Sequence, residues 1–304
     1  MIPFLDLGAA YGELKPEIDA AVARVLESGW YILGPEVESF EGQWAQFCEA
    51  QHCVGLGNGL DALTLALRAL DIGEGDEVIV PSNTYIATWL AVSNVGAVPV
   101  PVEPDPATHN IDPARIEAAL TARTKAILPV HILGHPCDME PIVEASRKYD
   151  LLVLEDASES LGATYMGRMT GHLGDVACFS FNGNKIITTG GGGMILTDDE
   201  DLAEKGRYLT TQAKDDPLRY IHHEIGYNFR MTNIQAALGV AQLEQLPKFL
   251  DRKREIFHQY QNALNDIDGL SIADVPEYAE NNHWMNLLQI DSKTYGENRD
   301  ELRK

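Results

Sequence analysis

Apolar positions along the chain alternate between short continuous runs and stripes that repeat about every 3.6 residues. The continuous runs predict strands buried on both faces, and the stripes predict amphipathic helices. The predicted strands cover residues 54–56, 78–80, 98–102, 126–130, 151–154, 176–181 and 194–197. Because helical stripes separate most of these strands, the pattern predicts an α/β fold, with a parallel sheet covered by helices on both faces.

The same pattern suggests how the chain is divided. Helices are predicted at residues 13–28, 36–47, 60–70, 84–95, 138–148, 233–247 and 250–265. A further helix is expected to begin at Asp112-Pro113, and Pro99 and Pro101 disfavour a central position for the strand at 98–102. Charge density rises after residue 247, so we expect a large domain at residues 1–247, with an N-terminal helical segment, and a small domain at residues 248–304.

Composition changes this picture mainly through charge. The 304 residues include 23 Lys and Arg against 46 Asp and Glu, and the net charge of −23 disfavours DNA or RNA as a partner. We see no signal peptide and no apolar stretch long enough to span a membrane, so a cytoplasmic protein without a membrane partner is expected. The four cysteines lack metal-binding spacing, so we expect buried free thiols and no bound metal.

Lys185 has the most informative surroundings of any residue in the sequence. It follows the mostly small, polar residues 180–184 and precedes the glycine run 190–193, between two predicted strands. Asp156 lies upstream at the end of an apolar strand, and ligands bind at the carboxyl ends of parallel strands. This combination is typical of a lysine that forms a Schiff base, although a single lysine is usually a solvated surface charge.

The other candidate positions have both a functional and a structural interpretation. The turn at residues 57–59 opens a helix, where it could bind phosphate or simply connect strand and helix. Asp156 could hold a pyridine nitrogen protonated or cap a helix, and Tyr85 could stack on a cofactor or belong to the core. Asn228 and Arg230 place an amide and a guanidinium in one loop, which local turn bonding and a surface ion pair would also explain.

Taken in order, these motifs resemble those of one protein family. The matching segments are 57–62, 84–88, 129–131, 155–157, 179–181 with Lys185, 190–193 and 226–231. They look like the DegT/DnrJ/EryC1/StrS family of sugar-nucleotide aminotransferases, which use pyridoxal 5′-phosphate (PLP). The resemblance implies a fold-type I, aspartate aminotransferase-like architecture with a large three-layer domain and a smaller C-terminal domain. It also implies a homodimer whose active sites lie at the subunit interface.

The resemblance assigns a role to each matching residue. Lys185 would bind PLP as a Schiff base and Asp156 would pair with the pyridine nitrogen, which makes these two the catalytic residues. Asn228 would reach the phosphate of the neighbouring subunit's cofactor, and Arg230 would meet the anionic substrate near the same interface. The residues expected to bind the cofactor are Gly59 and Leu60 through their N–H groups, Tyr85 through its ring, Asp156, Glu159, Ser180, Lys185 and Asn228.

Three features depart from the family pattern. Leu60 stands where a Thr or Ser side chain often binds the phosphate, and Glu159 stands where Gln or His is common near the phenolic oxygen of PLP. A carboxylate there would repel the phenolate unless it is protonated or faces a cation. The chain also ends at Lys304, where family members usually continue, so the small domain is expected to be incomplete.

The implied activity is a ping-pong transfer of an amino group from L-glutamate to a nucleotide-linked keto-sugar, for surface glycans or secondary metabolites. Segment 182–189 resembles enzymes that aminate carbon 4, so a 4-keto-6-deoxyhexose linked to UDP or dTDP is the favoured substrate. Segments 57–62 and 84–88 look more like enzymes that act on a 3-keto-6-deoxyhexose, which is the alternative. Lys185 disfavours a PLP-dependent dehydratase, which has histidine there, and a non-catalytic PLP-binding protein is the alternative outside enzymes.

Overall fold

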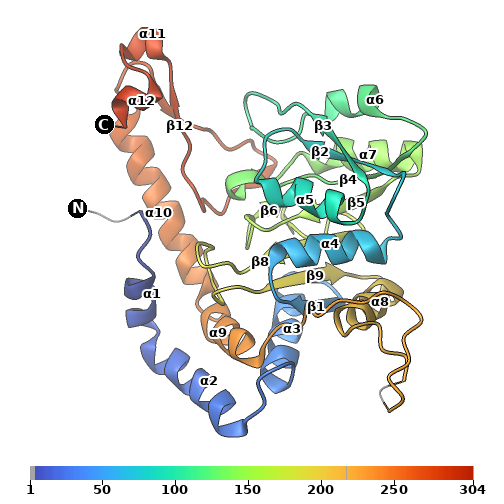
Figure 1. Cartoon of the computed structure of the whole chain (residues 1–304). Coiled ribbons are helices and arrows are strands. Elements are labelled where there is room, and N and C mark those ends of the chain that lie inside the picture. The colour runs from blue at the N-terminus through green and yellow to red at the C-terminus, as the bar shows by residue number, and fades with distance from the viewer. Residues whose placement is uncertain (1–3, 217, 304) are drawn as a thin grey trace.

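A seven-stranded sheet lies at the centre of the fold (Figure 1). The computed structural model describes residues 4–216 and 218–303. In sheet order the strands are β1 (His52–Leu56), β9 (Gly193–Thr197), β8 (Val176–Ser180), β5 (Leu152–Asp156), β4 (Thr124–Ile127), β2 (Glu77–Pro81) and β3 (Val98–Val102). Strand β9 is antiparallel to both of its neighbours, and the other adjacent pairs are parallel. The predicted α/β fold with a mainly parallel sheet is confirmed.

Helices cover both faces of the sheet and give three layers. Val54 and Leu56 of β1 pack in the core beneath one helical layer, whereas Cys53 packs in the core beneath the other, as the alternation of side chains along a strand requires. The first layer holds α4 (Gly59–Ala69), α5 (Ile86–Asn94) and α8 (Glu200–Thr210). The second holds α3 (Pro35–Phe47), α9 (Asn233–Leu243), α6 (Ile116–Ala119) and α7 (Met139–Tyr149).

Two details follow the local sequence. Strand β3 lies at the edge of the sheet, where Pro99 and Pro101 remove the fewest sheet hydrogen bonds, as predicted. The Asp112 side chain accepts a hydrogen bond from the N–H of Ala114 at 3.0 Å, and a 3-10 turn η1 (Pro113–Arg115) begins there and leads into α6. All four cysteines are free and buried, which confirms that prediction.

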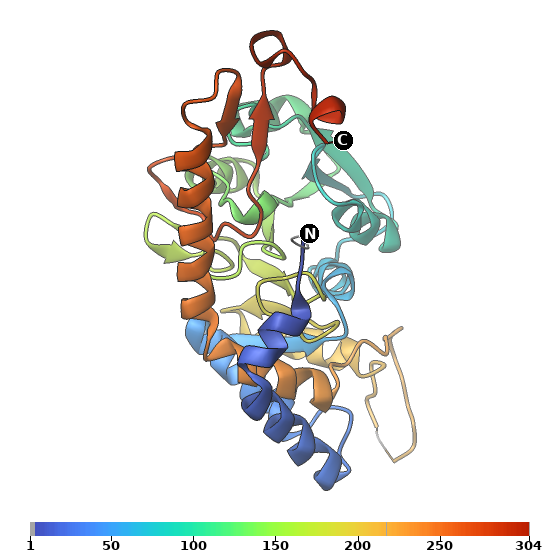
Figure 2. The ribbon, with the colours of Figure 1, turned by 90° about the vertical axis from the view of Figure 1, so that its left-hand side faces the viewer.

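Helix α10 (Leu246–Leu264) leaves the three layers and runs toward the C-terminal segment (Figure 2). The predicted domain boundary at residue 247 falls in its first turn and stays a prediction. Among the described residues, no helix is both long and apolar enough to cross a membrane. The remaining elements are α1 (Leu7–Glu13), α2 (Lys15–Ser28), η2 (Ile132–Gly134), β6 (Thr164–Tyr165), β7 (Arg168–Met169), β10 (Leu270–Ile272), β11 (Ala279–Glu280), β12 (Leu288–Ile290), α11 (Ser292–Tyr295) and α12 (Arg299–Leu302).

The sheet topology gathers the candidate residues at one edge. The parallel strands β1, β2, β5 and β8 all end at their carboxyl edge, where residues 57–59, Tyr85, Asp156 and Ser180 follow or close them. Because β9 runs in the opposite direction, the connection between β8 and β9 also lies at that edge. Lys185 is part of this connection, so the antiparallel strand brings the lysine to the same edge as the other residues.

Candidate active site

A cavity of about 400 Å³ opens at the carboxyl edge of the sheet. It receives residues from the sheet edge, from the starts of α4 and α5, and from the segment between β11 and β12. Its lining residues are Asn58, Gly59, Leu60, Leu63, Thr84, Tyr85, Ile86, Ala87, Thr88, Leu90, Val130, Asp156, Ser158, Glu159, Ser180, Asn182, Asn184, Lys185 and Trp284. Seven of the residues predicted to bind a cofactor therefore line one cavity: Gly59, Leu60, Tyr85, Asp156, Glu159, Ser180 and Lys185.

Asp156 is the last residue of β5 and is held from three sides. Its carboxylate accepts hydrogen bonds from the Thr88 hydroxyl at 2.9 Å and from the Ser158 N–H at 3.2 Å. Its own N–H donates to the carbonyl of Pro129 at 2.9 Å. Thr88 and Asp156 are both buried, so these contacts fix the direction in which the carboxylate faces the cavity.

Glu155, the residue before Asp156, is fully buried on the other side of β5 and makes its own network. The Cys137 N–H donates to His131 Nδ1 at 3.0 Å, so the histidine proton sits on Nε2, which donates to the Glu155 carboxylate at 2.9 Å. The same carboxylate accepts from the N–H groups of Gly171, Leu173 and Gly174 at 2.7–2.8 Å. Burial by itself raises the pKa of Glu155, but these hydrogen bonds outweigh it and hold the pKa below its ordinary value.

Replacing Glu155 with Gln is expected to lower the free energy of unfolding by about 2–4 kcal/mol near neutral pH, because an amide cannot accept all of these donors. The pKa of Glu155 is lower in the folded than in the unfolded protein. The ionised carboxylate therefore stabilises the fold fully at pH values above the ordinary carboxyl pKa near 4.5, and this stabilisation is lost as the pH falls through the folded-state pKa. Thermal unfolding measured at several pH values should therefore show a difference in melting temperature between wild type and variant that becomes smaller in acid. Glu144→Gln, at an exposed position, serves as the control and should melt at the wild-type temperature. A difference in melting temperature between wild type and Glu155→Gln that does not change with pH would contradict this explanation.

Lys185 and Glu159 form the ionisable pair of the cavity. The lysine Nζ lies 3.8 Å from Glu159 Oε1, and both side chains are largely buried. Burial lowers the pKa of Lys185, against the opposing charges of Glu159 and Asp156. Burial likewise raises the pKa of Glu159, against Lys185 and the N–H of Leu133, which donates to Glu159 Oε2 at 2.7 Å. Burial thus shifts both groups toward their neutral forms, and a neutral amine is the form that attacks a carbonyl carbon.

The N-terminus of α4 lines another part of the cavity. Asn58 caps the helix by accepting a hydrogen bond from the Asp61 N–H at 2.9 Å. The first N–H groups of a helix have no partner within the helix, and the helix dipole is positive there, so this end suits an anion. A Cβ added to Gly59 would lie 2.8 Å from Cβ of Ser180, so only glycine keeps the Ser180 hydroxyl and the helix start this close together.

Tyr85 stands at the cavity mouth. It is the N-cap residue of α5, and 73% of it is exposed in the single chain. The interpretation of Tyr85 as a core residue is therefore wrong, and its ring is free to meet a ligand.

Asn228 and Arg230 lie outside the cavity of their own chain. Arg230 forms a β-bridge with Leu56, and its guanidinium donates to Asn228 Oδ1 at 2.6 Å and 3.1 Å. The local bonding that the loop pattern suggested is therefore present. Their predicted roles toward a neighbouring subunit stay predictions.

Comparisons with known proteins agree with this geometry. A model of the DegT/DnrJ/EryC1/StrS aminotransferase family matches residues 13–304. The chain belongs to this family. A dTDP-3-amino-3,4,6-trideoxy-alpha-D-glucose transaminase of Streptomyces venezuelae is 47% identical over 89% of this chain and 71% of its own length. A GDP-perosamine synthase of Caulobacter vibrioides is 50% identical over 80% of this chain and 66% of its own length. The crystal structure of S. venezuelae DesV in complex with a ketimine intermediate superposes with a TM-score of 0.94 at 44% identity, covering 99% of this chain and 80% of DesV.

The predicted enzyme class and cofactor are thereby confirmed: the chain is a PLP-dependent aminotransferase. The cavity of this aminotransferase fits PLP in its chemistry. It offers a buried amine at Lys185, a carboxylate at Asp156 for the ring nitrogen, and an anion-binding helix start beside the Gly59–Ser180 contact for the phosphate.

Three residues contribute to the candidate site without a signal in the sequence. Thr88 belongs to the matching segment 84–88, but the sequence assigns it no role, because its hydrogen bond to Asp156 joins residues far apart in the chain. No motif in the sequence points to the N–H of Leu133, which bonds Glu159, or to the ring of Trp284, which faces Lys185. Leu133 has a left-handed backbone with φ of 58°, and no sequence signal marks a leucine for that conformation. Trp284 lies outside the segments that carry the family resemblance, the last of which is 226–231.

Proposed function

We propose that this enzyme transfers an amino group from L-glutamate to a nucleotide-linked keto-sugar, in amino-sugar synthesis for surface glycans or secondary metabolites. The observation that carries the proposal is the buried Lys185 amine, which shares one cavity with Asp156 and the N-terminus of α4. The relatives named above are a dTDP-sugar transaminase and a GDP-sugar synthase, which supports a nucleotide-linked substrate of either kind. Four free thiols support a cytoplasmic location.

The residues of the cavity divide the chemical work. PLP supplies a protonated pyridine ring that draws electrons from the amino-acid α-carbon. Asp156, fixed by Thr88 and Ser158, keeps the proton on the ring nitrogen. Lys185 would hold the cofactor, and its amine, when free and neutral, would take the proton from the amino-acid α-carbon and pass it to the cofactor. Glu159 has a raised pKa and lies beside the amine, so it can carry a proton without repelling the cofactor's phenolic oxygen.

For the sugar, we favour a 4-keto-6-deoxyhexose linked to UDP or dTDP. The support is the sequence of the β8–β9 connection, residues 182–189, which contains the lysine and lies nearest the chemistry. A 3-keto-6-deoxyhexose is the second candidate, because one relative is named for a 3-amino sugar. Incubation of the PLP enzyme with L-glutamate and each keto-sugar nucleotide, followed by NMR of the product, distinguishes the two by the carbon that bears nitrogen.

The donor is tested before the sugar. The purified enzyme with PLP should show the visible absorbance of lysine-bound cofactor, and L-glutamate should convert it to the amine form of the cofactor and release 2-oxoglutarate. A spectrum that L-glutamate leaves unchanged would refute glutamate as donor. Conversion by glutamate without amination of any keto-sugar nucleotide would refute the acceptor, and a bound cofactor that no amino acid converts would favour a non-catalytic PLP-binding protein.

We also propose a homodimer in which Asn228 and Arg230 serve the neighbouring active site. The support is that both residues sit outside their own cavity, although they belong to the matching motifs. Mixing Lys185→Ala with Asn228→Ala chains is expected to restore activity to about a quarter of wild type, because each mixed dimer regains one intact site. Each variant is assayed alone as the control. Absence of restoration, while mass spectrometry detects mixed dimers, would contradict the shared site.

A further inference from the structure

Trp284 reaches the active site from the C-terminal part of the chain. It lies between β11 and β12 and is only 8% exposed. The Lys185 Nζ lies 4.2 Å from the centre of its ring, well within the distance at which an aromatic face attracts a cation. The indole N–H donates to the carbonyl of Asn184, the residue before the lysine, at 2.7 Å. One side chain therefore contacts both the lysine amine and the backbone that presents it.

The segment that carries Trp284 is fixed to the large sheet region by Asn282. The Asn282 side-chain amide donates to the carbonyls of Glu159 at 2.8 Å and Leu161 at 3.0 Å. Its oxygen accepts from the backbone N–H of Trp284 at 2.9 Å. The fit is close, because a Cβ on Gly134 would overlap the Asn282 side chain. Asn282 thus connects the backbone of Glu159 with the backbone of Trp284.

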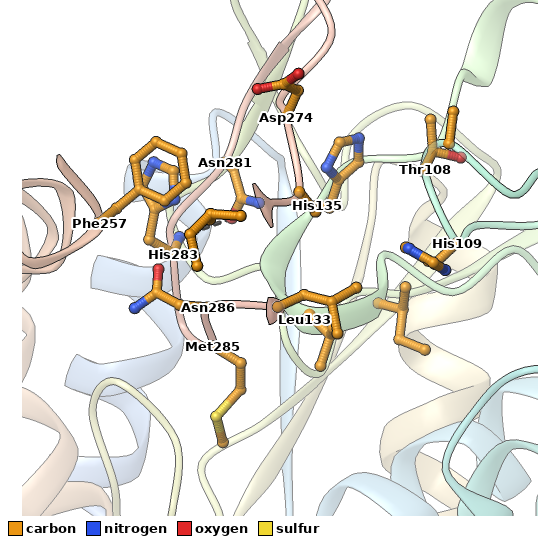
Figure 3. Close-up of a pocket in the computed structure, with 15 residues that line it drawn as sticks. Thr108, His109, Leu133, His135, Phe257, Asp274, Asn281, His283, Met285 and Asn286 are labelled. Atoms are coloured by element: carbon orange, nitrogen blue, oxygen red, sulfur yellow. Dashed lines mark hydrogen bonds between the residues drawn. The ribbon is translucent and has the colours of Figure 1, made fainter. Parts of the chain in front are cut away.

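A second set of contacts joins this segment to α10, and Figure 3 shows the one between His283 and Phe257. His283 stacks on Phe257 of α10, with ring centres 4.1 Å apart and an angle of 21° between the planes. Lys253, also on α10, donates to the carbonyl of Trp284 at 3.2 Å. Contacts with the sheet region and with α10 therefore hold the backbone that carries the indole.

The surroundings of the amine explain why an aromatic face matters here. The Lys185 side chain is 9% exposed and its carboxylate neighbour Glu159 is 3.8 Å away, beyond hydrogen-bond distance. Burial outweighs the opposing charges of Glu159 and Asp156, so these carboxylates alone stabilise the ammonium weakly. A ring face attracts the ammonium without a second charge that would itself need burial, and it attracts the neutral amine much less.

From this arrangement we propose that Trp284 is a positioning residue, which holds the amine of Lys185 against its indole face and within the cavity whenever that amine carries a proton and is not bound to cofactor. The inference rests on the proposed role of Lys185 as the cofactor lysine. If so, Trp284, which lies outside the sheet layers, determines both the position of the free Lys185 amine and its affinity for a proton.

The test changes the charge distribution of the ring but hardly its size. The full chain, freed of PLP, is produced with mono-, di- or trifluorotryptophan, and the pH dependence of Lys185 acetylation by acetic anhydride is followed by peptide mass spectrometry. Fluorine weakens the negative face of the ring, so the midpoint for Lys185 should fall stepwise, by about 0.5–1 pH unit in the trifluoro protein. The exposed Lys125 serves as internal reference and should not shift.

A matched variant separates Trp284 from the other three tryptophans of the chain. In Trp284→Phe, fluorotryptophan should leave the Lys185 midpoint unchanged, because Trp30, Trp44 and Trp89 remain labelled but do not contact the amine. An unchanged midpoint in the wild-type series, or an equal shift in the Phe variant, would overturn the proposal. These titrations use no cofactor, so they are independent of the spectral test that decides whether Lys185 binds PLP.

Discussion

Lys185→Ala is expected to abolish amino transfer, with a loss of roughly 10⁴-fold or more in rate, because no other amine lines the described part of the cavity. The variant should bind PLP without the visible absorbance of a lysine-bound cofactor. The rate of 2-oxoglutarate release and the absorbance spectrum measure the two effects.

Stability provides the control for this variant. Burial makes the charged form of Lys185 unfavourable in the folded protein. Removal of this side chain should therefore leave the melting temperature unchanged or raise it. The exposed Lys125→Ala should keep both spectrum and rate. A Lys185→Ala protein that is folded and still transfers amino groups at more than about one hundredth of the wild-type rate would exclude Lys185 as the catalytic lysine.

Asp156→Asn is expected to slow the glutamate half-reaction by about 10³-fold, because a neutral amide cannot keep the proton on the ring nitrogen. Stopped-flow absorbance with L-glutamate measures this rate directly. The amide oxygen can still accept from Thr88 or Ser158, so the fold should be retained.

Two comparisons make the Asp156 result specific. Thr88→Val keeps the carboxylate but removes the 2.9 Å hydrogen bond that directs it, and should slow the reaction by only about tenfold. Asp71→Asn, at an exposed position, should have no effect. If Asp156→Asn proved no slower than Thr88→Val, the charge on Asp156 would not be what the reaction requires.

The sequence predicted the sheet well because its strands are short apolar runs that need burial on both faces. Residues 152–154 and 176–179 are such runs, and both became central strands. The direction of β9 was not predictable, since its residues are equally apolar in a parallel or an antiparallel strand. The sequence pattern did not predict helix α8. Three of the residues on its buried side are Ala203, Gly206 and Thr210, which are too small or too polar to form an apolar stripe.

The site was predictable only where neighbouring residues form a motif. Lys185 and Asp156 stand in short segments whose composition is unusual, and both line the cavity. The support around them is non-local: Thr88 is 68 residues from Asp156, and Trp284 is 100 residues from the Asn184 carbonyl that it contacts. Such pairs acquire meaning only after the chain has folded, and a single sequence does not reveal them.

Because β9 runs opposite to β8, the length of the loop that carries Lys185 determines where this lysine lies. Ser180 pairs with Gly193, so the loop between them starts and ends on two adjacent strands. Within it, the Thr189 N–H bonds the Phe181 carbonyl at 2.9 Å and the Phe181 N–H bonds the Gly192 carbonyl at 3.0 Å. Loss of one residue would therefore force either a slip in strand register, which turns side chains to the opposite face, or a retreat of Lys185 from the cavity. Chains that diverge in substrate have more freedom to vary the cavity mouth than to shorten this loop.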